Sequence, residues 1–398
     1  MPAMSTKPAL FLLLLMALAM EARAQVSAPY RWVVDSLQHS APTLQMLQKQ
    51  LQANEASAKA GSLFADPELE VALYTSQPDE GTRHDLRLTQ RIEFPLYYVH
   101  RSRIRRLQAD MAQSDYLVHR NEWVKEVYQV CSHIVYYNAY VKLYAHCAEN
   151  TQKVASIYEE RLRQGDCSIL DYNRMQTELA AVENKLHIAQ VEHALMADNL
   201  LMLAGGIGIE IQQDTFSPVT LPANFDEWLD SVRQQTPALQ LIAQQNSAAA
   251  ENLTLNKLAW LPAVTIGYAA ELTPGENYRG ATAGLALPLW QRHGTVREAR
   301  LQQQASQAAL NDAQTRFKGS MKALYTKALA LQRALNNLDA TLQRHNSEEL
   351  LFRALKAGEI TLEYYLQQVE FYHDTEIDIL EIQHELEQTV IELTTIGE

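Results

Sequence analysis

The stretch LRQGDCSILDY at residues 162–172 recurs 193 residues later as LKAGEITLEYY at residues 355–365. The two copies share a Leu, a Gly, a hydroxyl residue and a Tyr in the same order. Two further pairs keep a similar spacing: FPLY at 94–97 matches LPLW at 287–290, and PTLQ at 42–45 matches PALQ at 237–240. Matches at a nearly fixed offset indicate an internal duplication. The sequence therefore predicts two halves built on one plan: a helix, two strands, a very long helix, a turn and another long helix.

The long helices carry the strongest signal. Residues 98–164 contain neither Pro nor Gly, and the distance from a Pro to the tip Gly is 70 residues in both halves, Pro95–Gly165 and Pro288–Gly358. Apolar or small residues recur in the first of these segments in steps of three and four, as in a coiled coil. We therefore expect two helices of ~67 residues, each ~100 Å long at ~1.5 Å per residue, lying side by side. The recurring positions are Ile134, Tyr137, Val141, Tyr144, Ala148, Ala155, Tyr158 and Leu162.

The helix that returns from the first tip is shorter. It keeps the same rhythm from Tyr172 to Leu203 and stops at Gly205-Gly206, about half the length of its partner. A helix from Tyr30 to Phe64 supplies roughly the missing half, so two short helices stacked end to end would accompany one long helix. The predicted organisation is a first repeat at residues 25–204, an equatorial linker rich in Gly, Pro and Asn at 205–228, and a second repeat at 229–398.

Four segments show the two-residue alternation of β-strands, with one apolar face and one polar or small face. Each spans about 8 to 10 residues, close to the ~9–11 that a tilted strand needs to cross a bilayer. Four strands cannot close a barrel with a lumen, since even small barrels have about eight. Strands in a membrane would therefore require an oligomer, while on the strands alone an ordinary half-buried sheet is an equal alternative. The apolar positions are Leu69, Val71 and Leu73; Leu86, Leu88, Ile92 and Phe94; Val264, Ile266, Tyr268 and Leu272; and Ala283, Leu285 and Leu287.

Aromatic residues flank the base of both strand hairpins. The first hairpin has Phe64, Tyr97 and Tyr98, and the second has Trp260 and Trp290. Aromatic side chains gather at both interfaces of membrane barrels. We therefore expect Phe64, Tyr97, Trp260 and Trp290 to lie at a membrane interface, in contact with outer-membrane lipid.

The N-terminus has the pattern of a secretory signal peptide. A short segment with one positive charge at Lys7 precedes an apolar run of about a dozen residues, and Ala22-Arg23-Ala24 supplies an A-x-A cleavage site. We expect residues 1–24 to be removed. Of the 34 basic and 47 acidic residues in the whole chain, Lys7, Arg23 and Glu21 fall in this leader, so the mature chain carries a formal charge of −14. Nucleic acid is an unsuitable partner for such a surface.

The sequence points away from an enzyme. Its histidines lack metal-ligand spacing and no Gly-rich loop ends in Lys-Ser or Lys-Thr, so we expect no metal site and no cofactor. The acids near the tips, among them Asp171 and Glu363, lie on helical hairpins in water and not in the dry pocket that paired catalytic carboxylates need. Cys131, Cys147 and Cys167 are expected to be free thiols, since the first two lie ~24 Å apart along one helix.

The chain resembles the TolC-type outer-membrane efflux proteins, the outer membrane factors of tripartite efflux systems, over essentially its whole mature length. The resemblance rests on the order, duplication and spacing of short motifs: DP at 66–67 and LP at 261–262 before each strand hairpin, FPL at 94–96 and LPL at 287–289 after it, and the two tips. It implies an α+β, mostly α fold in which a homotrimer closes one twelve-stranded outer-membrane β-barrel and a periplasmic α-helical tunnel. It also implies a passive exit duct whose partners are a periplasmic membrane-fusion (adaptor) protein and an inner-membrane pump. The GEITL form of the second tip is similar to members that serve heavy-metal or cation RND-type pumps.

The resemblance further implies that the two tips form a periplasmic gate and the site where the adaptor docks. The family's gate Asp, six residues after the tip Gly, is Asp171 here, while its other gate positions hold different residues. Those positions are occupied by Leu355, Ile360, Tyr364 and Gln367.

The candidate site residues follow from this comparison. We expect Gly165 and Gly358 to mark the adaptor-docking tips. We expect Asp171, Tyr364 and Tyr365 to belong to the gate, and Asp171 could also pair with Arg161, Arg163 or Arg174. One alternative stays open, a periplasmic coiled-coil adaptor or scaffold without membrane insertion. An adaptor typically has a single coiled-coil hairpin, whereas here both kinds of hairpin occur twice, which favours the channel.

Overall fold

The computed structural model describes residues 30–60, 63–75, 82–273, 275–288, 290, 293–345 and 347–397. The expected leader at residues 1–24 lies outside this part of the chain. The described residues belong to two compact units, one within Met1–Gln45, Asn121–Val232 and Gly319–Glu398, the other within Met46–Arg120 and Arg233–Lys318. The helices α3, α4 and α8 each contribute residues to both units.

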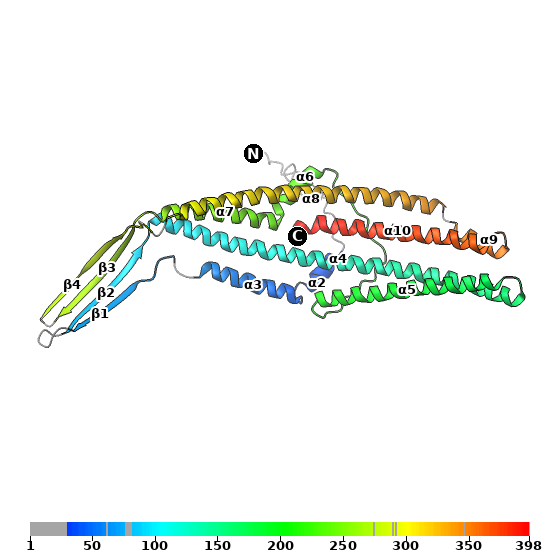
Figure 1. Ribbon diagram of the computed structural model, residues 1–398, viewed down its shortest axis with the longest axis horizontal. Coiled ribbons are helices and arrows are strands. Elements are labelled where there is room, and N and C mark those ends of the chain that lie inside the picture. Colours follow the sequence, from blue (N-terminus) through cyan, green and yellow to red (C-terminus); the bar gives the residue numbers. More distant parts are fainter. Residues whose placement is uncertain are drawn as a thin grey trace, which may run out of the picture. The chain divides into compact units, whose positions relative to one another are not determined.

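The order of helices and strands repeats along the chain, as the duplicated motifs predict (Figure 1). The first half contains α2 (Arg31–Leu37), α3 (Pro42–Lys59), β1 (Glu68–Thr75), β2 (Thr82–Ile92), α4 (Pro95–Gln164) and α5 (Ile169–Leu203). The second contains α6 (Phe225–Gln235), α7 (Pro237–Leu258), β3 (Ala263–Thr273), β4 (Glu276–Ala286), α8 (Thr295–His345), α9 (Glu348–Ala357), α10 (Leu362–Thr394) and a short 3-10 turn, Thr395–Gly397.

The first very long helix is confirmed, because α4 runs for 70 residues without a break. Its coiled-coil seam with α5 is also present, because the buried side chains of α5 follow the predicted rhythm in steps of four, three, seven and eleven: Met175, Leu179, Val182, Ala189 and Leu200. Knobs at three- and four-residue spacing stay on one face of a helix, which explains why this seam is buried.

Two expected helices are each divided into two. The second long helix ends at His345 and resumes at Glu348, so α8 and α9 replace one continuous helix. Glu348 and Glu349 lie in the first turn of α9, where acidic side chains are favourable. The expected helix from Tyr30 to Phe64 is α2 followed by α3. Pro42 begins α3, where its missing N–H costs nothing.

The four strands form one antiparallel sheet in the order β1-β2-β3-β4. The register pairs Leu69 with Leu88 and Leu88 with Tyr268 on one face, whereas Glu70 pairs with Arg87 on the other. The apolar side chains of the first face are exposed, including Leu73 and Leu285. The alternation read from the sequence is therefore present, with strands of 8 and 11 residues and with β1 and β4 at the two edges.

The linker between the repeats is held against helices of its own unit by side-chain donors. Asn138 Nδ2 on α4 donates to the carbonyl oxygens of Ile211 and Gln213, both at 2.8 Å. On α8, the Tyr325 hydroxyl donates to Pro222 O at 2.6 Å. These bonds satisfy three carbonyl groups of the segment after α5, which forms no helix or strand until α6 begins at Phe225, four residues before the expected start of the second repeat.

Three further observations bear on function. No helix in the described part of the chain is both long and apolar enough to cross a membrane. Among the same residues, no group of three or more His, Cys, Asp or Glu side chains is placed to hold a metal ion. Cys131, Cys147 and Cys167 are free, the first two of them buried.

Candidate functional site

The two tips have the same backbone construction. Gly165 has φ 78° and Gly358 has φ 76°, the left-handed conformation that closes a helix C-terminus. The amide of the next residue reaches back five positions in each case, Asp166 N to Arg161 O at 2.8 Å and Glu359 N to Ala354 O at 2.9 Å. A Cβ at either glycine would have no atom within 4 Å. Backbone conformation, and not lack of space, therefore requires Gly at both tips.

A hydroxyl side chain starts the helix after each tip. Ser168 Oγ accepts from Asp171 N at 3.1 Å, and Thr361 Oγ1 accepts from Tyr364 N at 3.2 Å. In the first tip the Asp171 carboxylate completes a capping box, since Asp171 Oδ2 accepts from Ser168 Oγ at 2.7 Å and from Ser168 N at 3.4 Å. Asp171 and Tyr364 therefore occupy equivalent cap positions in the two repeats. The carboxylate of Asp171 helps to begin α5.

The three arginines near Asp171 each have another partner within the protomer. Arg161 Nη2 donates to Leu355 O at 3.4 Å and to Lys356 O at 3.3 Å, which joins the first hairpin to the second. Arg163 pairs with Glu159 and Glu160 on its own helix, at 2.5 Å and 3.3 Å. Arg174 Nη1 lies 3.9 Å from Glu363 Oε1. The structure thus links the hairpins through Arg161 and Arg174.

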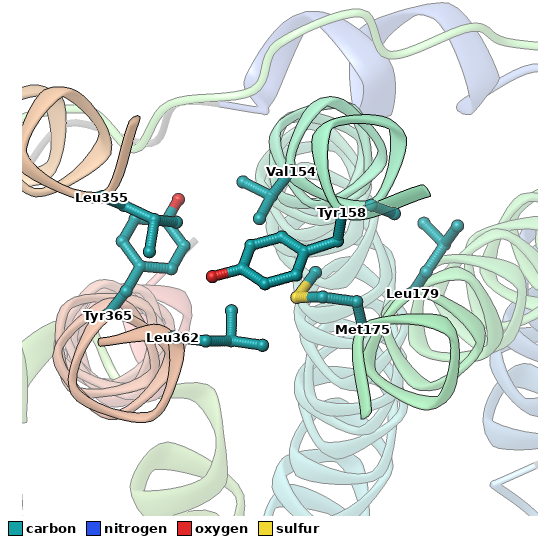
Figure 2. Close-up of a cluster of buried hydrophobic side chains, with 8 residues drawn as sticks. Val154, Tyr158, Met175, Leu179, Leu355, Leu362 and Tyr365 are labelled. Carbon is teal, nitrogen blue, oxygen red and sulfur yellow. The ribbon is translucent and has the colours of Figure 1, made fainter. Parts of the chain in front are cut away.

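A buried apolar cluster packs the two hairpins together just behind the tips. It contains Val154, Ala155, Tyr158, Met175, Leu179, Leu355, Leu362 and Tyr365. Figure 2 shows the Tyr158 side chain reaching from α4 toward Leu362 and Tyr365 on α10, with Leu355 against the Tyr365 ring. Four helices, α4, α5, α9 and α10, contribute to it. The cluster fixes the spacing of the tips through apolar contacts.

The two adjacent tyrosines of the second tip lie in different surroundings. Tyr365 is 4% exposed, and burial raises the pKa of its hydroxyl to about 12. Tyr364 is 49% exposed. Of the pair, only Tyr364 presents its side chain to the solvent, while Tyr365 belongs to the cluster. Both tyrosines were predicted from the sequence to be gate residues. The gate role of Asp171, Tyr364 and Tyr365 stays a prediction.

The aromatic residues at the base of the sheet are largely exposed. The rings of Phe64 and Tyr98 are tilted against each other with centroids 4.8 Å apart, and Tyr97 meets Tyr98 edge-on at 5.9 Å. Trp260 and Trp290 are both exposed, Trp290 the more so. Tyr98 contributes to the structure as well, since its hydroxyl accepts from Glu93 N at 2.8 Å. The expected position of Phe64, Tyr97, Trp260 and Trp290 at a membrane interface stays a prediction.

Several contacts of the tip region escaped the sequence interpretation. Arg161 at the tip, and Glu348 with Asn150 and His373 higher on the hairpins, join helices that are far apart in the sequence. The division between α8 and α9 also escaped it. The sequence around this division lacks the Gly or Pro that usually marks the end of a helix.

Taken together, a duplicated chain with one amphipathic four-stranded sheet and two long helical hairpins has the fold of the TolC-type outer-membrane channels. The Campylobacter jejuni CmeC outer membrane channel aligns over 95% of this chain and 89% of its own, with a TM-score of 0.75 and 12% identity. The outer membrane protein VceC of Vibrio cholerae covers 93% of this chain and 96% of its own, with a TM-score of 0.78 and 16% identity. The Neisseria gonorrhoeae MtrE outer membrane channel, in its open state, covers 93% and 89%, with a TM-score of 0.71 and 13% identity.

At these identities the likeness is one of fold. No protein-family model matches the sequence, and no curated protein matches it. The resemblance seen in the repeated motifs is confirmed at the level of the fold, over nearly the whole chain.

Proposed function

We propose that this protein is the outer-membrane exit duct of a tripartite efflux system, through which substrates pass without energy input from the duct itself. A single observation carries the proposal: an amphipathic sheet, apolar and exposed on one face and charged on the other, joins helical hairpins in the fold of known outer-membrane channels. Exposed contiguous apolar surface marks contact with a membrane or a partner. The sheet would face lipid with the side that bears Leu69, Val71 and Leu73.

The charged face suits the lumen. Arg83 lies 2.8 Å from Asp85 and 3.0 Å from Glu271, and Arg87 lies 3.5 Å from Glu70. Ion pairs of this kind hold charge next to water, where their desolvation cost is small. The strands therefore alternate apolar-out and polar-in, as strands of a water-filled barrel do.

The edges and faces that one copy leaves without a neighbour support the proposed homotrimer. The described sheet has β1 and β4 at its edges, and four strands per copy would give twelve in three copies. The helix α5 also carries a second apolar stripe, separate from its buried seam. Its exposed members are Ile188, Val191, Leu195 and Met202, again in steps of three, four and seven. A second stripe of this period suits a second helical neighbour from another protomer.

The tips supply the remaining parts of the proposal. Gly165 and Gly358, with open space around them, would be where a periplasmic adaptor docks, and an inner-membrane pump of the RND type would deliver the substrate. Asp171, Tyr364 and Tyr365 would form or support the periplasmic gate. MtrE is described in an open state, which supports a gate with more than one state in this fold.

The test is to extract membranes in mild detergent, measure the mass of the complex, and record conductance in planar bilayers. We expect a heat-modifiable trimer in the outer-membrane fraction that conducts ions. A soluble periplasmic monomer without conductance would reject the duct and favour the coiled-coil adaptor or scaffold.

A further inference from the structure

The start of each long helix carries a positive charge that contrasts with the rest of the chain. The whole sequence has a formal charge of −13, yet residues 95–109 contain four arginines and neither Asp nor Glu. Residues 295–300 contain two arginines and one acid. Because α4 begins three residues after β2 and α8 begins nine residues after β4, within the unit that holds the sheet, these arginines lie near the base of the sheet. We call this set the basic belt: Arg101, Arg103, Arg105, Arg106, Arg297 and Arg300.

The stability of the helices does not account for the basic belt. The N-terminal end of a helix carries a partial positive charge, so a cation in the first turn is unfavourable. Arg297 lies in the first turn of α8 next to a single acid, Glu298, and the first turn of α4 contains no acid. The arginines therefore indicate an interaction with something outside these helices.

Two arginines of the belt hold the chain segment that follows α3. Arg101 Nη1 donates to Leu63 O at 3.1 Å, and Arg105 donates to another carbonyl oxygen of this segment at 2.8 Å. The residue after Leu63 is Phe64, whose exposed ring lies against Tyr98 on α4. Spacings of three and four residues keep Tyr98, Arg101 and Arg105 on one face of α4. The exposed aromatic ring and the arginines therefore share one side of this helix.

A groove of about 500 Å³ lies beside the belt, between α4 and α7. It is lined by charged and hydroxyl side chains, Arg103, Arg106 and Asp110 from α4 and Ser247 and Glu251 from α7. Glu251 is already engaged, because it contacts the His100 ring and lies 3.5 Å from Arg103 Nη1. Arginine and hydroxyl side chains are donors, and the planar guanidinium group matches the oxygens of a phosphate. The groove therefore presents phosphate-binding donors beside the base of the sheet.

Three arginines of the belt remain available for a ligand. Arg106, Arg297 and Arg300 are exposed, and none of them forms an ion pair or a hydrogen bond with another described residue. Along α4, the arginines lie three to eight residues beyond Tyr98, or ~4.5–12 Å at ~1.5 Å per residue. The polar headgroup layer of a bilayer is roughly 5–8 Å deep on each side. With the aromatic residues at the membrane interface, the guanidinium groups would lie at the level of the lipid phosphates.

We propose that the basic belt binds the phosphate groups of anionic phospholipids in the leaflet that meets the base of the sheet. The proposal rests on the duct function proposed above, which puts the sheet in a membrane. The belt adds a charged contact to the apolar and aromatic contacts of the sheet. Each Arg near an anionic membrane surface raises the affinity about fivefold, and this gain is screened by salt.

The test compares two triple variants of the full chain with wild type. The belt variant carries Arg106→Gln, Arg297→Gln and Arg300→Gln. The control variant carries Lys318→Gln, Arg333→Gln and Arg344→Gln. The control removes the same charge from exposed residues of α8 that lie at least 18 residues, or ~27 Å, beyond Arg300. Gln is a good helix former, and the six replaced side chains have no ion pair with other described residues, so both variants should form trimers.

The measurement is tryptophan fluorescence of the trimer in phosphatidylcholine vesicles that contain brominated phosphatidylglycerol, whose bromine quenches nearby indole rings. Trp260 and Trp290 lie at the base of the sheet, and the other three tryptophans belong to the other unit. At low salt we expect wild type and the control variant to prefer phosphatidylglycerol by about fivefold or more, and the belt variant to bind the two lipids within about twofold. At about 1 M salt the preference of wild type should disappear. An equal preference in wild type and the belt variant overturns the proposal.

Two additions exclude other ligands of the belt. Exchange of chloride for inorganic phosphate at equal ionic strength should leave the preference unchanged; its loss in phosphate alone would make the belt a site for soluble anions and overturns the proposal. A belt variant that keeps the lipid preference but shifts the reversal potential under a salt gradient has its arginines in the lumen, which also overturns it. Should the triple variant fail to assemble, Arg106→Gln should still lower the preference relative to Lys318→Gln, and an equal preference in these two rejects the belt.

Failure of the belt and failure of the duct give different results. If wild type neither inserts into vesicles nor conducts ions, the duct function fails and the belt with it. If wild type inserts and conducts but shows no preference for phosphatidylglycerol, the duct stands and only the belt fails.

Discussion

Placing Arg at Val71 should prevent assembly of the trimer, whereas Arg at the neighbouring Ala72 should not. Val71 lies on the apolar face of β1 opposite Leu86 and is 61% exposed, while Ala72 lies on the charged face opposite Asp85. Adjacent strand residues differ only in the face they occupy. An Arg that faces lipid near the bilayer midplane costs about 2–4 kcal/mol, so three copies cost roughly 6–12 kcal/mol per trimer. That range is comparable to the whole stability of a typical domain. An Arg facing Asp85 and water should cost less than about 0.5 kcal/mol.

The assay compares the two variants on unboiled gels and by urea unfolding after folding into lipid vesicles. We expect wild type and Ala72→Arg to migrate as a heat-modifiable trimer, and Val71→Arg to remain monomeric or to lose most of its urea resistance. Equal assembly of both variants would refute the claim that this face meets lipid. If Ala72→Arg alone failed to assemble, the assignment of the two faces would be reversed. The charged face, and not the apolar face, would then be the one buried in the assembly.

Four further predictions concern the helical part. Gly165→Leu and Gly206→Leu introduce the same backbone strain, about 1–2 kcal/mol, because both glycines have positive φ and open space. Both variants should form trimers, and only Gly165→Leu should lose adaptor cross-linking and export. Asp171→Ala and Ser168→Ala each break the capping box and should lower stability by about 1 kcal/mol. A higher open fraction of the channel in Asp171→Ala alone would assign Asp171 to the gate, whereas equal conductance of the two variants would leave Asp171 as a helix cap. Tyr365→Ala should cost about 3–5 kcal/mol in thermal unfolding, as for a buried aromatic, whereas Tyr364→Ala should change conductance with little loss of stability. Burial raises the pKa of Glu387, so the free energy of unfolding should fall as pH rises from 4.5 toward that raised pKa. Glu387→Gln, which still accepts from Tyr30, should abolish this pH dependence when unfolding is measured against pH.

The repeat and its glycines made the architecture predictable from the sequence. A tip Gly with φ near 77° can be predicted without knowing which residues contact it, because the requirement for Gly comes from the local backbone. The same holds for the two-residue alternation of the strands, which fixes both faces once one residue is assigned. The α5 seam followed from the three- and four-residue spacing that keeps Met175 and Leu179 on one side of the helix.

The contacts of the tips were not predictable in the same way. Asp171 has its closest partner three residues away in Ser168, and the choice between this cap and a distant Arg depends on side-chain geometry that spacing does not encode. Arg161 binds backbone carbonyl groups of another hairpin, and such acceptors exist at every residue. The division between α8 and α9 was hidden for a related reason. Without Gly or Pro, a helix can pass through HNSEE or stop there, and contacts made by Asn150 and Tyr372 favour the stop.

The two repeats differ most at their helical tips. In the first tip the capping box is closed by residues of the same hairpin, and α4 continues unbroken above it. In the second, Tyr364 replaces the capping acid and a joint interrupts the helix, so the segment is positioned by side chains that the first hairpin supplies. The first tip is closed by its own residues, whereas the second also depends on α4, through the polar contacts of Asn150 and Arg161 and through the buried apolar cluster. The duplication therefore gives two hairpins with the same backbone at the tip but different supports, one local and one shared with the neighbouring hairpin.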